Sequence, residues 1–266
     1  MEASTRSGRR AGGKLGGVAV IRLHLSDTHP DPTLPWADGD TSVYAYLIDH
    51  PDGLILVDTG VGEGSALIDA LYHPDHHDLV EAIERTGHHI GDVRTVINSH
   101  LHFDHCGHNH LFPSVPILVQ RREYQAVHHG SYTVEEWVDF PGARIQQLDG
   151  DHQVAPGVRV VSTPGHTTGH QSVVVDDSEG RTVICAQAAY TAADFGSGRT
   201  DPHSTEAADV QLASIDRLRS LRPDRVCFSH DATDSDAGCS GVVSATSRPG
   251  LAWPKAGLAW PKAGLA

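Results

Sequence analysis

The stretch Ser99-His100-Leu101-His102-Phe103-Asp104-His105 decides the fold of this chain. Four of its side chains can bind a metal ion, and they stand within six residues. Imidazole together with carboxylate suits zinc or a similar first-row metal. A single ion takes three or four protein ligands, and four side chains this close along the chain are poorly placed to reach one ion. We therefore expect two adjacent ions, which draw further ligands from elsewhere.

Spacing suggests how these side chains are presented. His100 and His102 are two residues apart, so in an extended segment both rings project to the same side. Asp104 and His105 follow at an expected turn and can face a second position. His166 and His230 each follow a predicted strand, which makes them candidates for the missing ligands.

Composition limits the class of protein. Lys and Arg number 20 against 34 Asp and Glu, a net charge of −14 that repels polyanions and argues against nucleic acid or an anionic membrane as partner. No run of 18 apolar residues occurs, so no transmembrane helix is expected. Four scattered cysteines without a C-x-x-C pair indicate reduced thiols and a cytoplasmic protein. The partner expected is a neutral or weakly polar small molecule; a homo-oligomer is left open.

The chain divides into three parts. Residues 1–17 are expected to form a disordered arm, 18–235 the folded domain that carries the metal site, and 236–266 a tail of low order in which a seven-residue unit recurs. Predicted strands are 18–25, 42–48, 53–57, 93–97, 117–119, 158–161, 171–175, 181–186 and 226–228, and predicted helices are 78–85 and 207–221. Strands and helices mixed in two comparable halves indicate a layered α/β fold.

Five motifs stand out along the chain: Val57-Asp-Thr-Gly60, Ser99 to His105 with Gly107-His-Asn109, Thr163-Pro-Gly-His-Thr-Thr-Gly-His-Gln-Ser172, Ala188-Ala-Tyr190-Thr191 and Phe228-Ser-His-Asp231. In these motifs the chain resembles the metallo-β-lactamase fold superfamily, and within it most closely the N-acyl homoserine lactonases. The resemblance covers about residues 18–235. It implies a four-layered αβ/βα sandwich with the site along one edge of the sheets.

The resemblance also implies the ligands. One ion is expected on His100, His102 and His166, and the other on Asp104, His105 and His230. Zinc is the expected metal, as one ion or two, with manganese and iron left open. Asp58 is expected to orient a ligand rather than bind metal.

Gln187 is a departure from the superfamily's pattern. It stands where the resemblance places an aspartate that bridges the two ions. A neutral amide can offer one oxygen or donate a hydrogen bond to a metal-bound water, but it removes one negative charge. The second ion should then bind less tightly; a single ion and an asymmetric pair both remain open, and we favour the pair.

The expected chemistry is hydrolysis. A metal-bound water with its pKa lowered to about 7 supplies a hydroxide that attacks a lactone carbonyl. Tyr190 is expected to donate to the carbonyl or leaving oxygen, and Asp104 to carry the proton to the leaving alkoxide. Loops 28–40 and 124–140 are the candidate pocket, in which Trp36, Trp137 and Phe140 could line an apolar slot. The alternatives are a same-fold hydrolase of another ester, aryl ether or amide bond, and a metal-binding protein without turnover.

Overall fold

The computed structural model describes residues 18–33, 39–128, 133–202, 204–233 and 235–236. The expected arm 1–17, the repeat-containing part of the tail and Trp36 lie outside the described residues. Among the described residues, none of the helices is long and apolar enough to cross a membrane.

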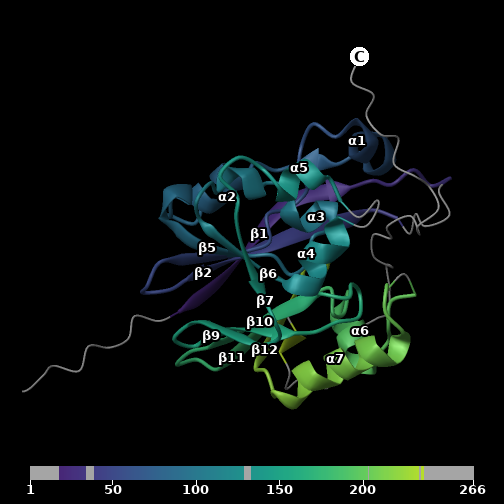
Figure 1. Cartoon of the computed structure of the whole chain (residues 1–266). Coiled ribbons are helices and arrows are strands. Elements are labelled where there is room, and N and C mark those ends of the chain that lie inside the picture. Colours follow the sequence, from purple (N-terminus) through teal and green to yellow (C-terminus); the bar gives the residue numbers. More distant parts are fainter. Residues whose placement is uncertain (1–17, 34–38, 129–132, 203, 234, 237–266) are drawn as a thin grey trace, which may run out of the picture.

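Two mixed β-sheets form the centre of the molecule (Figure 1). The strands of the first are β1 (Ala19–Thr28), β2 (Thr41–Asp49), β3 (Leu54–Val57), β4 (Asp75–His76), β5 (Val93–Ile97), β6 (Pro116–Gln120) and β7 (Arg144–Leu148), in the order β4-β1-β2-β3-β5-β6-β7. Those of the second are β8 (His152–Ala155), β9 (Val158–Ser162), β10 (Gln171–Asp176), β11 (Arg181–Ala186), β12 (Arg225–Phe228) and β13 (Ser235–Asp236), in the order β13-β12-β11-β10-β9-β8.

Most helices of the described part are short. The α-helices are α1 (Ala66–Tyr72), α2 (Leu79–Glu84), α3 (Phe103–Cys106), α4 (Arg121–Val127), α5 (Glu135–Val138), α6 (Ala192–Ser197) and α7 (Ala208–Ser220), and two 3-10 turns are η1 (Ile90–Asp92) and η2 (Asn109–Leu111). The predicted helices 78–85 and 207–221 correspond to α2 and α7. Asp78 caps α2, since its carboxylate accepts a hydrogen bond from the Glu81 amide.

The strand sequences explain the layers. Successive side chains of a strand point to opposite faces, and both faces of central strands such as β3 and β10 are buried, so these strands are largely apolar. In β10, Val173 and Val175 pack between the two sheets, whereas Val174 packs in the cluster that contains Ile215 and Leu218 of α7. The chain therefore has the expected four-layered αβ/βα architecture, with helices outside both sheets.

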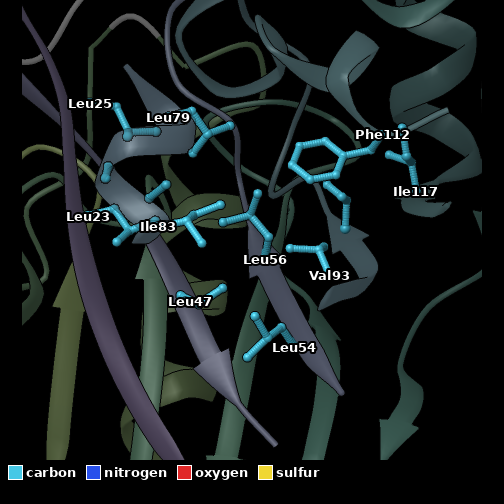
Figure 2. Close-up of a cluster of buried hydrophobic side chains, with 13 residues drawn as sticks. Leu23, Leu25, Leu47, Leu54, Leu56, Leu79, Ile83, Val93, Phe112 and Ile117 are labelled. Carbon is cyan, nitrogen blue, oxygen red and sulfur yellow. The ribbon is translucent and has the colours of Figure 1, made fainter. Parts of the chain in front are cut away.

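The outer face of the first sheet carries its own apolar cluster, drawn in Figure 2. Leu47 and Leu56 from β2 and β3 meet Leu79 and Ile83 of α2 there. All four side chains are at most 1 % exposed, so α2 closes this face of the sheet. Burial of this kind stabilises a domain by about 1.5–3 kcal/mol for each large aliphatic side chain.

Strand direction places the predicted site at one edge. β3 and β5 are parallel in the first sheet, and β11 and β12 are parallel in the second. β9 runs in the same direction as β11, because both are antiparallel to β10. The segments that follow these five strands carry Asp58, the histidine run, His166, Gln187 and His230.

Bonds between the sheets hold this edge together. The Gln171 amide donates to the Ser99 carbonyl at 2.8 Å, and the Tyr46 hydroxyl donates to the Phe228 carbonyl at 2.6 Å. The Gln171 side chain also donates to the Asn98 and Leu118 carbonyls. Each contact joins the first sheet to the second beside a predicted ligand, so the site is fixed where the sheets meet.

Candidate metal centre

Three imidazoles converge on one point. His102 Nδ1 lies 3.1 Å from His100 Nε2 and 3.0 Å from His166 Nε2, and one ring nitrogen from each residue lies within 4.8 Å of the others. Burial and the neighbouring histidines hold the pKa of His100 and His102 well below the ordinary value, so both rings are neutral and carry a lone pair. Ligand nitrogens of a tetrahedral zinc site are about 3.3 Å apart. The spacing of these nitrogens fits such a site.

A second group lies beside the first. Asp104 Oδ2 is 3.3 Å from His105 Nε2 and 3.4 Å from His230 Nε2. All three atoms are buried without a hydrogen-bond partner among the described residues. Buried polar atoms normally have a hydrogen-bond partner or a bound ion. Three such atoms that face one another without a partner therefore indicate a cation site. His100 joins the two groups, because it also clusters with Asp104 and His105.

Three of the proposed ligand rings are held in place through their other nitrogen. His105 Nδ1 lies 2.8 Å from Asp58 Oδ2, and His166 Nδ1 lies 3.2 Å from Asp201 Oδ2. His230 Nδ1 lies 2.9 Å from the Ser42 carbonyl, to which it can donate. Such contacts fix the tautomer and orientation of a metal-binding histidine and leave its other nitrogen for the ion.

The pKa values of the histidines differ between the two groups. Burial disfavours the charged form of His105, but the Asp104 and Asp58 carboxylates outweigh it and raise the pKa of His105 to about 10. Burial lowers the pKa of His230 to about 4. Burial opposes ionisation of Asp104 too, yet His105 keeps the pKa of this carboxyl far below its usual range. A cation at this point would compete with the proton on His105.

Asp58 lies where the resemblance implied an orienting residue. It follows β3 with a φ of 64°, a left-handed conformation that costs energy for a residue other than glycine. Its carboxylate accepts hydrogen bonds from the Ser99 amide and hydroxyl at 2.7 and 2.8 Å as well as from His105. The strained turn thus fixes the start of the histidine run and one ring of the second group.

Gln187 lies at the end of β11. The preceding Ala186 has a φ of 52°, and the Gln187 side chain is 1 % exposed. The backbone N–H of Gln187 donates to His170 Nε2 at 3.2 Å, while His170 Nδ1 contacts Thr163. Gln187 Oε1 is buried and finds no hydrogen-bond partner in the part of the chain that the structure describes. A buried amide oxygen without a partner is consistent with a weak contact to an ion or its water.

Tyr190 packs between the two groups. Its ring stacks on His230 with centroids 5.6 Å apart and meets His166 edge-on at the same distance. The hydroxyl lies 3.4 Å from His166 Nδ1 and also hydrogen-bonds Asp201. Burial, reinforced by Asp201, holds the pKa of Tyr190 well above its ordinary value, so the phenol keeps its proton and can donate it in a hydrogen bond.

Two buried carboxylates at the site were missed by sequence reasoning. Asp201 orients His166, and Glu123 at the start of α4 is fully buried. Glu123 accepts hydrogen bonds from the Leu101 amide at 2.9 Å and from the Thr167 hydroxyl at 2.7 Å. It thereby ties the histidine run to the His166 loop. Both residues stand in ordinary polar segments, and nothing in their neighbouring sequence marks them.

One expectation of local structure needs correction, because Asp104 and His105 lie in the helix α3 rather than at a simple turn. Trp137 packs with Val61 and Phe103 in an apolar cluster, and Phe140 packs against the cluster of Figure 2, so both contribute to packing. Cys106 is fully buried, burial raises its pKa to about 12, and its thiol contacts the Leu101 and His102 carbonyls; it is a packing residue.

Comparison with known proteins supports a metallo-hydrolase site. The metallo-beta-lactamase superfamily pattern matches residues 38–230. An N-acyl homoserine lactonase of a Bacillus species is 33 % identical over 243 residues, which is 85 % of this chain and 96 % of the relative. The N-acyl homoserine lactonase AttM of Rhizobium radiobacter is 31 % identical over 74 % of this chain and 81 % of its own.

A solved structure is similar as well. It is an N-acyl homoserine lactone hydrolase with the product N-hexanoyl-L-homoserine bound at its catalytic metal center. It superposes with a TM-score of 0.68 at 28 % identity, covering 82 % of this chain and 94 % of that one.

Proposed function

Because the chain belongs to the metallo-β-lactamase superfamily, and within it to the N-acyl homoserine lactonase family, we propose that it opens the lactone ring of N-acyl homoserine lactones by metal-dependent hydrolysis. The observation that carries the proposal is the pair of adjacent ligand groups, His100 with His102 and His166, and Asp104 with His105 and His230. Hydrolysis of this substrate would make the protein a quorum-quenching enzyme.

The donor set fits zinc. Five of the six side chains in the two groups are imidazoles. The pKa values of His100, His102 and His230 are lowered, and the Nε2 atoms of His105 and His230 are buried without a partner among the described residues. The fifth imidazole, His166, faces His102 directly. Bound divalent ions supply Lewis acidity and an acidified water at neutral pH. Everything else in the reaction falls to the chain's own residues.

Two residues are proposed to handle protons and charge. The Tyr190 hydroxyl stays protonated, so it can donate a hydrogen bond to the lactone carbonyl or to the departing ring oxygen. To do so it would leave Asp201 and His166, which it now contacts. Asp104 has an ionised carboxylate with one unsatisfied oxygen, and it can carry the proton that the departing alkoxide must gain.

Gln187 is proposed to make the pair of ions asymmetric. Its amide gives no negative charge, so Asp104 is the single carboxylate among the proposed ligands. The ion held by Asp104, His105 and His230 then binds less tightly than the ion held by His100, His102 and His166, and it must also displace the proton from His105.

The test is a substrate panel on the zinc-loaded protein. N-acyl homoserine lactones of several chain lengths are compared with an aryl ester, an aryl ether and a β-lactam, and products are identified by mass. We expect a ring-opened acyl homoserine and one proton released per turnover at neutral pH, because the new carboxyl group ionises. A chelator should stop the reaction and added zinc should restore it.

The panel also separates the alternatives. Turnover of the ester or ether alone, with full zinc occupancy, would show a same-fold hydrolase of another bond. Zinc binding without turnover of any member would contradict hydrolysis.

A further inference from the structure

A separate cluster of metal-binding side chains lies at the edge of the first sheet, where β1 pairs with β4. It contains His24 and Asp27 of β1 and His77, which follows β4. One ligand atom from each of the three residues lies within 4.8 Å of the others. None of them belongs to the two ligand groups of the candidate metal centre.

A β-bulge creates this cluster. Residues three apart on a regular strand point to opposite faces, so His24 and Asp27 would normally be separated by the sheet. In the pairing with β2, His24 is opposite Tyr44 and Ser26 is opposite Val43, which leaves Leu25 as the extra residue. Leu25 and Ser26 are both buried, whereas His24 is exposed and Asp27 is half-buried. The bulge thus turns Asp27 to the face of His24, as bulges commonly do next to binding sites.

The bulged residue also positions the third side chain. The His77 amide donates to the Leu25 carbonyl at 2.8 Å, so the backbone bond that ends the β4 pairing fixes His77 beside β1. The His77 ring then meets the His24 ring edge-on, with centroids 4.4 Å apart. The three side chains are held by backbone hydrogen bonds of a sheet rather than by a loop.

Asp27 is prepared as an anionic ligand. Its Oδ1 accepts a hydrogen bond from the Ser42 hydroxyl at 2.6 Å and lies 3.0 Å from His24 Nε2. Partial burial works against ionisation, but these hydrogen bonds prevail and lower the pKa of Asp27. The separation of 3.0 Å is close to the ligand–ligand distance of a zinc site, about 3.3 Å.

We propose that His24, Asp27 and His77 bind a zinc ion at the surface, with water completing its coordination. Two imidazoles and one carboxylate are a common ligand set for first-row divalent metals. The His24 and Asp27 side chains are 39 % and 33 % exposed, so this ion exchanges more readily than ions at the buried centre. The nearby cation, Arg22, is engaged elsewhere, since it stacks on Tyr44 and donates to the Ala232 carbonyl.

The surface site and the buried centre share one residue. Ser42 donates its hydroxyl to Asp27, and its carbonyl contacts His230 Nδ1. The experiment therefore has to count the surface ion separately from ions at the centre.

The test measures zinc per chain by elemental analysis after equilibrium dialysis of the full-length protein against a series of free zinc concentrations. The low concentration is chosen so that it fills the buried centre, and the wild type should gain one more ion at high zinc than it holds there. His24→Ala and His77→Ala should each lose that additional ion and keep the ions bound at low zinc. His110→Ala removes an exposed histidine outside the cluster and should keep all of them.

Copper gives an independent readout. Cu²⁺ added to the zinc-loaded protein should show hyperfine coupling to two imidazole nitrogens in its electron paramagnetic resonance spectrum, and His24→Ala should reduce this to one at most. An additional ion that survives in both variants, one that His110→Ala also removes, or the lack of any additional ion in the wild type would overturn the proposal. Retention of the low-zinc ions in the variants shows that they are folded.

Discussion

The proposed role of Gln187 is to lower the negative charge around the proposed pair of ions. Replacement by aspartate shortens the side chain by one methylene group and adds a carboxylate close to where the buried Oε1 lacks a partner among the described residues. We expect Gln187→Asp to bind the ion of Asp104, His105 and His230 on the order of tenfold more tightly. Gln187→Asn is the neutral control. Zinc titration with a competing chelator gives the affinities, and equal affinities for Gln187→Asp and the wild type would contradict the charge argument.

Asp58 and Asp201 offer a matched pair of variants. Asp58 orients His105 of the second group, and Asp201 orients His166 of the first. We expect each Asp→Asn change to lower the affinity for the ion of its own group about 10- to 100-fold and to leave the affinity for the other ion nearly unchanged. Asparagine tolerates the left-handed backbone at Asp58, so that variant should fold. Stepwise zinc removal by a chelator resolves the two ions. If both variants lowered the affinity for the same ion, the assignment of Asp58 and Asp201 to different ions would be wrong.

At the scale of elements, Glu123 connects α4 to two loops of the site. Its carboxylate accepts the Leu101 and Gly169 amides and the Thr167 hydroxyl, all without exposure to solvent. Glu123→Gln puts an amide donor against these donors and should lower the free energy of unfolding by about 2 kcal/mol. Urea unfolding measures the change. Glu136→Gln, on an exposed side chain of α5, is the control and should have little effect; equal effects of the two variants would refute the connecting role.

Asp176 links the strands of the second sheet through Arg159 and Arg181. Partial burial opposes its ionisation, but the two guanidinium groups lower the pKa of Asp176 below its ordinary value of 3.8. A lowered pKa in the folded state stabilises the protein above about pH 4 and stops doing so as the pH falls through the folded-state value.

The variant Asp176→Asn should therefore lower the free energy of unfolding by about 0.5 kcal/mol at neutral pH. The effect is small because the ion pairs of Asp176 are partly exposed to solvent. The difference from the wild type should shrink as the pH falls below 4. Thermal unfolding across this range measures it, with Glu179→Gln as the exposed control. A cost that grows on acidification would contradict the assignment.

Across the whole molecule, the sequence predicted what continuous apolar runs and local motifs determine. The buried strands and α7 were found because their periodicity reports burial directly. β7 and β8 were missed because polar residues such as Gln146 and His152 interrupt the pattern on strands toward the ends of their sheets. The short helices α4 and α5 lack enough turns to show a periodicity.

The candidate site shows the same division. The proposed ligands could be picked out because each follows a strand end in a motif. Glu123 and Asp201 act through partners 22 and 35 residues away in the chain, and such contacts exist only once the fold has formed. The surface cluster was hidden for a similar reason, since His24 and Asp27 share a face only through the bulge at Leu25.

Anomalous diffraction at the zinc edge, from crystals of the zinc-loaded protein, can locate the proposed ions directly. We expect two adjacent peaks where the sheets meet, one bound by His100, His102 and His166 and the other by Asp104, His105 and His230. The second peak should be the weaker, because Gln187 brings no charge and His105 must lose a proton. A single peak, or no density between Asp104 and His230 at saturating zinc, would contradict the proposed pair of ions.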